Sequence, residues 1–433
     1  MTSAADVIVI GAGIAGLAAT QRLAAAGLNV MVLEARERLG GRIFTQHHDG
    51  YPVELGAEFV HGRPPEILNA VQAAGLKLAE ITGEFRSKVG AKWEDSGNLM
   101  TEVDELFDEI PIDGPDQSFR QYMENTHYSA EAKQQAARFV EGFHAADPER
   151  VGIHWLVKAT KAEESIDGDT SFRMPEGYNK LVETLANEIG GRSLILLNTP
   201  VTAVRWQKGE VVVISSQGEF RAPQAVITLP LGVLQAGSVE FTPPLAEKNK
   251  ALRLLSMGPV IRVSLCFQKK FWEDDPHMQE LSFLLTDNEH FPTWWTSNPL
   301  PYPILTGWAA GRYARALTGK SERQITTIAM RALGQILESD LQNKPQAVFM
   351  HDWQTDPFAR GAYSYGNVGG ADAAQLLAAP IEDTLFFAGE ATNSEGHNGT
   401  VNGAISSGRR AVDEILRANS HTYGRDQEIP FGR

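Results

Sequence analysis

Near its amino terminus the chain carries VIVIGAGIAGLAATQRLAAAGLNVMVLE, residues 7–34. The apolar run at its start predicts a buried parallel strand over residues 6–10. An Ala- and Leu-rich stretch predicts a helix over about 17–26, and a second strand follows at 30–33. A G-x-G-x-x-G pattern lies between the first strand and the helix. This order is typical of a dinucleotide-binding βαβ unit, so the sequence predicts an α/β fold.

Each glycine of the pattern has a physical reason to be there. Gly11 permits the tight turn, Gly13 lets the backbone approach a pyrophosphate, and Gly16 allows the helix to pack closely on the strand. Glu34, which ends the second strand, can accept hydrogen bonds from ribose hydroxyls, and N–H groups at the helix start favour phosphate. The alternative is a structural glycine turn with a surface glutamate. The predicted cofactor contacts here are Gly11, Gly13, Ile14, Ala15, Gly16, Glu34, Ala35 and Arg36.

A second glycine pair, Gly40-Gly41, follows among three arginines, Arg36, Arg38 and Arg42. It offers another close approach of backbone to ligand, and Arg42 can bind a pyrophosphate with two parallel hydrogen bonds. A solvated basic turn is the alternative. The G-x-G-x-x-G motif does not separate FAD from NAD by itself, and this second glycine pair with its arginines helps to do so.

Motifs further along the chain narrow the choice. After EARERLGGR at 34–42 come GAEFVHG at 56–62, TLPLGVL at 228–234 and FAGE at 387–390. In these stretches and in their order, the chain resembles the flavin-containing amine oxidase family, which includes monoamine oxidases, polyamine oxidases and lysine-specific histone demethylases. The motifs are specific for the family and poorly specific for the substrate.

The resemblance implies a Rossmann-type FAD-binding domain interleaved with an α+β substrate domain, in which helices roof a mixed sheet. The implied FAD-binding domain comprises 1–62, 174–254 and 356–420, and the substrate domain comprises 63–173 and 255–355, followed by a polar tail at 421–433.

The resemblance also implies the cofactor and its further contacts. FAD is expected to be held non-covalently, because Ala362 occupies the position of the flavin-linking cysteine of monoamine oxidases and Cys266 lies in another segment. Residues 386–390 and 399–404 also predict a strand, a turn and a helix start that face the cofactor; an ordinary strand–turn–helix is the alternative. The implied contacts are Arg42, Gly40, Gly41, Gly56, Ala57, Glu58, Phe59, Val201, Trp353, Gly389, Glu390, Gly399, Thr400 and Val401.

Four residues are the catalytic candidates. Tyr363 falls on the family's aromatic-cage position, where an aromatic face attracts a cation and excludes water. Thr400 takes the second cage position, as in the histone demethylase branch. His61 aligns with a histidine found near the flavin in polyamine oxidases, and a structural histidine is equally consistent. Apart from these four, Glu58, an implied cofactor contact, is interpreted as recognising a second amine or as capping backbone.

Arg262 is the fourth candidate and departs from the family. It stands where a lysine usually holds a water against flavin N5 and assists the reaction with oxygen. On the strand expected around 260–267, alternate residues are strongly apolar, whereas Arg262 shares the other, less apolar face with Ser264 and Cys266. That face is suited to lining a cavity, and a solvent-facing arginine is the alternative. Arginine keeps the charge but cannot deprotonate.

The resemblance implies an amine oxidoreductase. Hydride passes from the amine α-carbon to flavin N5, the imine is hydrolysed, and oxygen reoxidises the flavin to give hydrogen peroxide. The alternatives are an L-amino-acid oxidase recruiting Arg262, Arg173 or Arg312 for a carboxylate, an amine dehydrogenase with poor oxygen reactivity, and a flavin-loaded binding protein. A chromatin demethylase is disfavoured by the acidic charge. The amine, the cleavage side, the electron acceptor and the oligomeric state stay open.

Composition excludes several other classes. Among 433 residues, 39 Lys and Arg face 54 Asp and Glu, a net charge of −15 that disfavours nucleic acid. A single cysteine favours a reducing compartment, so a cytoplasmic location is expected. The sequence has no basic leader, uninterrupted membrane span, metal-ligand motif or G-x-S-x-G elbow.

Overall fold

A parallel sheet built from five distant segments is the first structural unit. In the computed structural model, which describes residues 5–95, 105–338 and 344–425, this sheet has the order β10-β2-β1-β14-β23. Its strands pair in parallel register, with Ile8 opposite both Met31 and Ala225. The strands are β10 (Ser193–Leu196), β2 (Val30–Leu33), β1 (Val7–Ile10), β14 (Gln224–Ile227) and β23 (Leu385–Phe387).

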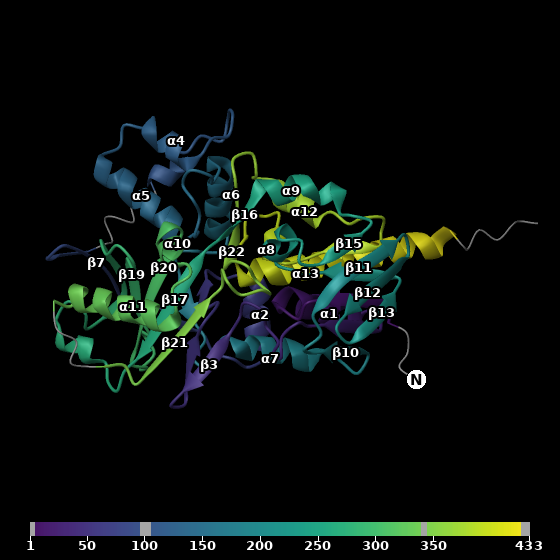
Figure 1. Cartoon of the computed structure of the whole chain (residues 1–433), viewed down its shortest axis with the longest axis horizontal. Coiled ribbons are helices and arrows are strands. Elements are labelled where there is room, and N and C mark those ends of the chain that lie inside the picture. Colours follow the sequence, from purple (N-terminus) through teal and green to yellow (C-terminus); the bar gives the residue numbers. More distant parts are fainter. Residues whose placement is uncertain (1–4, 96–104, 339–343, 426–433) are drawn as a thin grey trace, which may run out of the picture.

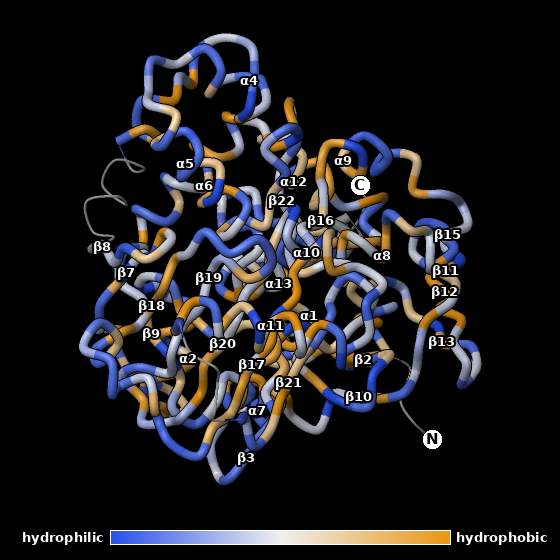
Figure 2. Tube along the Cα trace, turned by 60° about the vertical axis from the view of Figure 1, so that its left-hand side comes forward, coloured by the Kyte–Doolittle hydropathy of each residue, from blue (hydrophilic) through white to orange (hydrophobic). Residues whose placement is uncertain are grey.

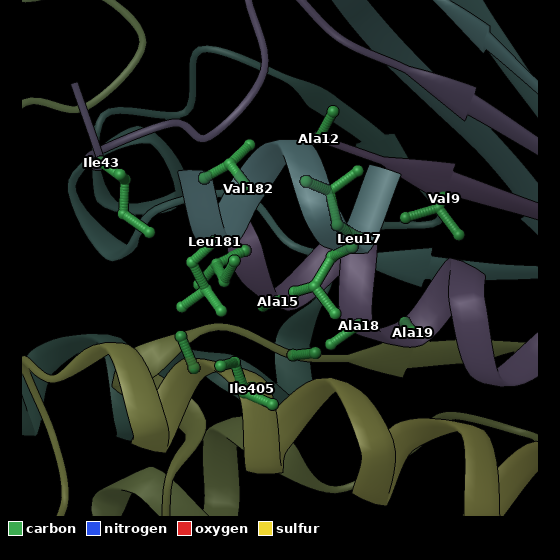
Figure 3. Close-up of a cluster of buried hydrophobic side chains, with 14 of the residues drawn as sticks. Val9, Ala12, Ala15, Leu17, Ala18, Ala19, Ile43, Leu181, Val182 and Ile405 are labelled. Atoms are coloured by element: carbon green, nitrogen blue, oxygen red, sulfur yellow. The ribbon is translucent and has the colours of Figure 1, made fainter. Parts of the chain in front are cut away.

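Two long helices pack side by side on this sheet. Figure 1 shows α13 (Val401–Arg425, yellow) running beside α1 (Ile14–Ala25, purple). The approach is close because a Cβ on Gly408 would lie 2.3 Å from the carbonyl oxygen of Ala15. Leu17 of α1 and Ile405 of α13 point into one buried cluster (Figure 3). The first and last thirds of the chain therefore share one core.

A mixed sheet forms the second unit, with the order β21-β17-β20-β19-β18-β7-β8. Ile261, Val263 and Leu265 of β17 (Val260–Cys266) pack with α10 (Arg312–Leu317) and α11 (Glu322–Ile336). Because side chains alternate along a strand, Arg262 and Ser264 project to the opposite face. The other strands are β21 (Ala347–Asp352), β20 (Ile304–Ala310), β19 (Thr293–Thr296), β18 (Leu281–Thr286), β7 (Glu84–Val89) and β8 (Lys92–Asp95).

Smaller elements connect and cover the two large sheets. A four-stranded sheet has the order β13 (Gly218–Ala222), β12 (Glu210–Ser215), β11 (Val201–Gln207), β15 (Glu240–Thr242). The two short pairings are β16 (Leu255–Gly258) with β22 (Tyr363–Gly366) and β3 (Thr45–His48) with β4 (Tyr51–Glu54). A three-stranded sheet has β9 (Ser171–Arg173) between β5 (Phe59–His61) and β6 (Ala79–Glu80).

The remaining helices complete the covering layers. They are α2 (Pro65–Ala73), α4 (Phe119–Glu124), α5 (Ala130–Gly142), α6 (Ile153–Glu164), α7 (Asn179–Glu188), α8 (Leu231–Gln235), α9 (Asn249–Leu254), α12 (Ala373–Ala378), η1 (Ala246–Lys248), η2 (Phe271–Asp274) and η3 (Glu390–Thr392). Hydrophobic residues gather in the middle of the molecule around α1, and hydrophilic residues occupy much of the outer loops (Figure 2). Within the described ranges, no helix is long and apolar enough to cross a membrane.

The α/β prediction is confirmed, and two helix boundaries differ from expectation. α1 begins at Ile14, because Gly13 is extended and serves as its N-cap, so the helix includes the third glycine. α13 continues to Arg425, whereas a polar tail was expected from 421. The part of that tail at 426–433 lies outside the described residues.

Candidate functional site

The first turn of α1 is built to receive an anion. Gly11 adopts φ +107°, and a Cβ on Gly16 would lie 2.0 Å from the Gly11 carbonyl oxygen, so both positions require glycine. The N-cap, Gly13, places no side chain over the helix start, and the first turn holds no acidic residue. The N–H groups of this turn have no partner within the helix. These N–H groups can therefore bind a phosphate, which is consistent with the prediction that Ile14 and Ala15 contact the cofactor.

Glu34 is fixed at the end of β2 beside this turn. Its side chain is 6% exposed, so a surface glutamate, the alternative to a functional role, is wrong. Oε2 accepts from the backbone N–H of Ala12 at 2.7 Å, and Oε1 accepts from the N–H of Arg36, the residue after Ala35, at 2.9 Å. A carboxylate has about four acceptor positions, so capacity remains for ribose hydroxyls.

The second glycine pair lies against the first motif. Gly40 donates from its N–H to the Ala12 carbonyl at 2.9 Å, and a Cβ on Gly41 would lie 3.2 Å from Gly13 Cα. Beside them, Arg38 is held 3.9 Å over the ring of Phe44, and its Nη2 is buried with no partner among the described residues. Burial lowers the pKa of Arg38 to about 10, so it stays cationic at neutral pH. Arg38 Nη1 donates to the carbonyls of Leu39 and Ile43, but among the described residues the partly buried guanidinium has no carboxylate partner, so its position beside two glycine turns fits an anionic dinucleotide.

The basic turn is ordered by ion pairs. Arg36 pairs with Asp356 at 2.7 Å, and Arg42 Nη1 pairs with Glu390 Oε1 at 2.8 Å. Arg42 is therefore already engaged by a carboxylate. Neither arginine belongs to a fully solvated turn, since their side chains are 15% and 24% exposed.

Glu390 links the carboxyl-terminal motif to that turn. Its Oε2 accepts from Gly399 N–H at 2.8 Å and from Ser364 Oγ at 2.6 Å. Gly389, just before it, adopts φ +122°. Next along the chain, Thr400 Oγ1 accepts from the N–H of Gly403 at 3.0 Å, capping the helix that begins at Val401. The residues predicted around 389–401 thus meet the Arg42 loop.

The segment from Gly56 to Phe59 lies along the same loop. A Cβ on Gly56 would lie 1.9 Å from the Arg42 carbonyl oxygen, and Ala57 N–H donates to that oxygen at 3.1 Å. Trp353 packs against Gly56 and donates from Nε1 to the Leu55 carbonyl at 2.9 Å. Val201, also predicted to bind the cofactor, begins β11 and packs, partly buried, against the buried core around β1 and β14.

A buried ionic cluster forms where Glu58 follows. Arg173 Nη1 pairs with Glu58 Oε1, and Arg262 Nη2 pairs with Glu58 Oε2. Trp295 Nε1 also donates to Oε2, at 3.1 Å. Arg262 is 3% exposed, so the alternative of a solvent-facing arginine is wrong. Burial lowers the pKa of each arginine to about 9, which leaves both cationic at neutral pH.

A cavity adjoins this cluster. It has a volume of about 30 Å³, enough for a water, and its lining includes Arg173, Arg262, Glu58, Ser264 and Glu54. The prediction that the polar face of β17 lines a cavity is confirmed. Burial raises the pKa of Glu54 to about 7, although it accepts from the N–H of Tyr178 at 2.7 Å.

Aromatic side chains form a closed chain of contacts beside the same cluster. From Phe143 the ring centroids are 5.4 Å to His61, then 5.8 Å from His61 to Phe59 and 5.5 Å from Phe59 to Trp295. Trp308 lies 5.5 Å from Trp295 and donates from Nε1 to the carbonyl of Gly142, the residue before Phe143. We call Phe143, His61, Phe59, Trp295 and Trp308, together with Tyr363, the aromatic ring.

Tyr363 closes the aromatic ring on the side of the cofactor motifs. Its hydroxyl donates to the Phe143 carbonyl at 2.7 Å, and its ring would lie 3.2 Å from a Cβ on Gly399. His61 Nδ1 is 3.2 Å from Ser171 Oγ, and burial lowers the pKa of His61 to about 4, so it is neutral near pH 7.

Sequence reasoning missed part of this arrangement. It did not single out Phe143 or Glu54, and it did not place Arg173 against Glu58. Neither an aromatic at a helix end nor a lone acid on a strand carries a local motif. In the described parts of the chain, no group of three or more His, Cys, Asp or Glu is placed to hold a metal ion.

Comparisons with known proteins agree with the geometry. A family model described as flavin containing amine oxidoreductase matches residues 14–416. Polyamine oxidase 4 of Oryza sativa subsp. japonica is 30% identical over 453 residues, covering 95% of this chain and 88% of that protein. Lysine-specific histone demethylase 1 homolog 3 of Arabidopsis thaliana is 29% identical over 484 residues, covering 95% of this chain but only 30% of that protein.

A solved structure shares the fold. Wild-type putrescine oxidase bound to putrescine superposes with a TM-score of 0.82 at 22% identity, covering 96% of this chain and 100% of that one. The match confirms the Rossmann-type α/β architecture combined with a second, mixed-sheet unit.

Proposed function

The chain belongs to the family of flavin-containing amine oxidoreductases, and from this premise we propose that it is an FAD-dependent amine oxidase. Family membership makes it a flavin enzyme that acts on amines. The dinucleotide-binding βαβ unit supports FAD as the form of the flavin. Oxygen as electron acceptor, with release of hydrogen peroxide, belongs to the proposal.

One observation carries the proposal: the aromatic ring abuts the cofactor motifs. Tyr363 packs on Gly399, and Arg262 Nη1 donates to the Gly56 carbonyl at 3.2 Å. An amine held among these side chains therefore lies next to the segments suited to a flavin.

The residues of the aromatic ring exclude water from the amine. Only a neutral amine can release hydride from its α-carbon, and a dry aromatic environment favours the neutral form. Tyr363 serves as the wall, with its hydroxyl anchored on Phe143, and Thr400 lies beside it at the start of α13. His61, neutral near pH 7, adds an uncharged ring to this wall. When bound, the flavin supplies the hydride acceptor, and the resulting imine is hydrolysed by water.

The same site holds the groups that would retain FAD. Gly13 and the first turn of α1 receive the pyrophosphate, Glu34 binds the ribose, and Arg38 supplies a cation whose Nη2 has no partner among the described residues. The absence of a cysteine at Ala362 supports non-covalent binding. The division into discontinuous domains and a cytoplasmic location also belong to the proposal; the parallel sheet, with strands from 7–10 to 385–387, supports the former.

Two alternative functions differ from this proposal, one in the substrate that is oxidised and the other in the electron acceptor. An L-amino-acid oxidase needs a guanidinium for the substrate carboxylate, but Arg262 and Arg173 already bind Glu58, and Arg312 pairs with Glu141 at 3.3 Å. The observation in favour of an amine dehydrogenase is Arg262, which stands where the family usually has a lysine that assists the reaction with oxygen.

Product analysis tests the proposal. The flavin-loaded enzyme is incubated in air with amines and L-amino acids, and carbonyl product and hydrogen peroxide are quantified. Equal yields of both from an amine support the oxidase. Carbonyl formed only with an artificial electron acceptor supports the dehydrogenase, and turnover of amino acids alone contradicts the proposal.

A further inference from the structure

The carboxylate that stands at the aromatic ring is already used by the protein. Glu58 Oε1 pairs with Arg173, and Oε2 pairs with Arg262 while also accepting from Trp295 Nε1. Its side chain is 10% exposed. A substrate ammonium would have to displace a guanidinium to reach it.

The aromatic faces beside Glu58 are occupied by the same cations. The guanidinium of Arg173 lies 4.7 Å from the ring centroid of Phe59, and that of Arg262 lies 5.4 Å from the centroid of Trp295. These are cation–π distances. Two guanidiniums against one carboxylate leave this wall positive, and Glu54, with its raised pKa of about 7, cancels that charge only in part.

Among the residues that the structure describes, the remaining titratable groups at the aromatic ring offer no anion without an ion-pair partner. His61 is neutral, with Nδ1 at 3.2 Å from Ser171 Oγ, and the Tyr363 hydroxyl donates to the Phe143 carbonyl. On α5, Glu141 pairs with Arg312 at 3.3 Å. Glu58 and Glu141, the carboxylates at the aromatic ring among the described residues, are therefore each ion-paired with an arginine, although Glu141 Oε2 accepts no hydrogen bond there.

The guanidiniums of Arg173 and Arg262 are likewise hydrogen-bonded within the protein, which makes them poor partners for a substrate carboxylate. Arg173 donates to the carbonyls of Thr296 at 2.7 Å and Asn298 at 3.2 Å, as well as to Glu58. Arg262 donates to the Gly56 carbonyl at 3.2 Å and to Ser264 Oγ at 3.3 Å. Every nitrogen of both guanidiniums thus has a protein acceptor.

Apolar surface continues from the aromatic ring to the outside. Phe283 lies 5.4 Å from Phe59, and Phe85 stacks on Phe283 at 4.7 Å. Phe85 is 44% exposed. Rings in contact from Phe59 to the exposed Phe85 offer apolar surface that suits a hydrocarbon or aromatic body.

We propose that the substrate is an amine with a single basic nitrogen on an apolar body. The net positive Arg173–Glu58–Arg262 cluster repels the second ammonium of diamines and polyamines, and its guanidinium nitrogens, each already bound to a protein acceptor, disfavour the carboxylate of amino acids. This inference rests on the proposed amine oxidase function. It separates the chain from the polyamine and putrescine oxidases that it resembles, because specificity here comes from a repulsive element.

Matched ligands test the inference on the flavin-loaded enzyme. The pairs are butylamine with 1,4-diaminobutane, hexylamine with 1,6-diaminohexane, and 2-phenylethylamine with L-phenylalanine. We expect the single-nitrogen amine of each pair to reduce the flavin with about 100-fold higher efficiency, because burying an uncompensated charge is costly. A diamine or the amino acid that matches or exceeds its partner overturns the inference and leaves the amine oxidase function intact.

A binding measurement distinguishes failure of the proposed amine oxidase function from failure of the specificity inference. The shift in thermal unfolding temperature is recorded with each ligand, which needs no turnover. If no amine reduces the flavin, the proposed function is wrong, and the order of the shifts still decides the specificity: larger shifts with the single-nitrogen amines support it, and larger shifts with diamines overturn it.

Two substitutions at one position test the electrostatic cause. Arg262→Met removes one cation, so we expect the preference for hexylamine over 1,6-diaminohexane to fall about 10-fold. Arg262→Lys keeps the charge and should preserve the preference within about 2-fold. An unchanged preference in Arg262→Met overturns the assignment. If that variant does not fold, Trp295→Phe, which frees one acceptor position of Glu58, is expected to lower the preference several-fold, and an unchanged preference there overturns it as well.

Discussion

Arg42 and Glu390 are 348 positions apart, yet Arg42 Nη1 donates to Glu390 Oε1 at 2.8 Å. Glu390 is 5% exposed and also receives the N–H of Gly399. This ion pair joins the turn after β2 to the turn before α13, and so unites the two ends of the chain around one cofactor site.

Arg42→Met is expected to weaken both the fold and the binding of flavin. It leaves Glu390 buried without its cation, which we expect to lower the free energy of unfolding by about 2 kcal/mol. Chemical denaturation and the flavin-to-protein absorbance ratio measure the two effects. Arg42→Lys, which keeps the charge, is the matched control and should retain most of the flavin. Full flavin content in Arg42→Met would falsify the role of the pair.

Tyr363 is expected to act through its ring more than through its hydroxyl. Tyr363→Phe loses one hydrogen bond to Phe143 and should reduce kcat/KM by about 5-fold. Tyr363→Ala opens the wall to water and should reduce it by about 100-fold. Steady-state kinetics with a single amine compares the two variants. Equal losses in both would show that the aromatic wall is not the important feature.

Arg262 is expected to limit the reaction with oxygen. Arg262→Lys restores the residue usual in the family, and we expect reoxidation of the reduced flavin by oxygen to become about 10-fold faster. Stopped-flow mixing of the photoreduced enzyme with oxygen measures this step alone. Arg205→Lys, at a site 63% exposed on β11, is the control and should leave the rate unchanged. A slower rate in Arg262→Lys contradicts the assignment.

Glu54 is expected to make stability fall as pH rises. Burial raises its pKa to about 7, so between about pH 4.5 and 7 the folded state binds more protons than the unfolded state. The free energy of unfolding therefore decreases over this range, by up to about 3 kcal/mol from this group. Glu54→Gln should remove that decrease, as measured by denaturation at several pH values. Glu210→Gln, 48% exposed, is the control. The same pH slope in Glu54→Gln and wild type would refute the assignment.

The cofactor half of the site could be predicted because its determinants are local. The turn at Gly11 and the close approach of Gly16 to the Gly11 carbonyl involve backbone atoms only a few residues apart in sequence. The spacing of the glycines therefore predicts both features. The burial of Glu34 follows from its place at the end of a central strand. Period-2 alternation likewise predicted that Arg262 leaves the apolar face of β17.

The substrate half could not be predicted in the same way. Glu58 directly precedes β5, Arg173 ends β9, and Trp295 lies on β19. Only the tertiary fold brings these three side chains together. Phe143, at the end of α5, takes part in two contacts of the aromatic ring. Its phenyl group lies against His61, and its backbone carbonyl accepts from the Tyr363 hydroxyl, an interaction that does not depend on the side chain at position 143. The pairing of Glu58 with two arginines changes the expected role of that acid from a substrate ligand to a structural anion.

The most direct test of the account is the anaerobic absorbance spectrum of the flavin-loaded enzyme during titration with 2-phenylethylamine. We expect the visible flavin absorbance to be lost in proportion to the amine added and to return when air is admitted. A spectrum that 2-phenylethylamine and the other single-nitrogen amines leave unreduced would contradict it.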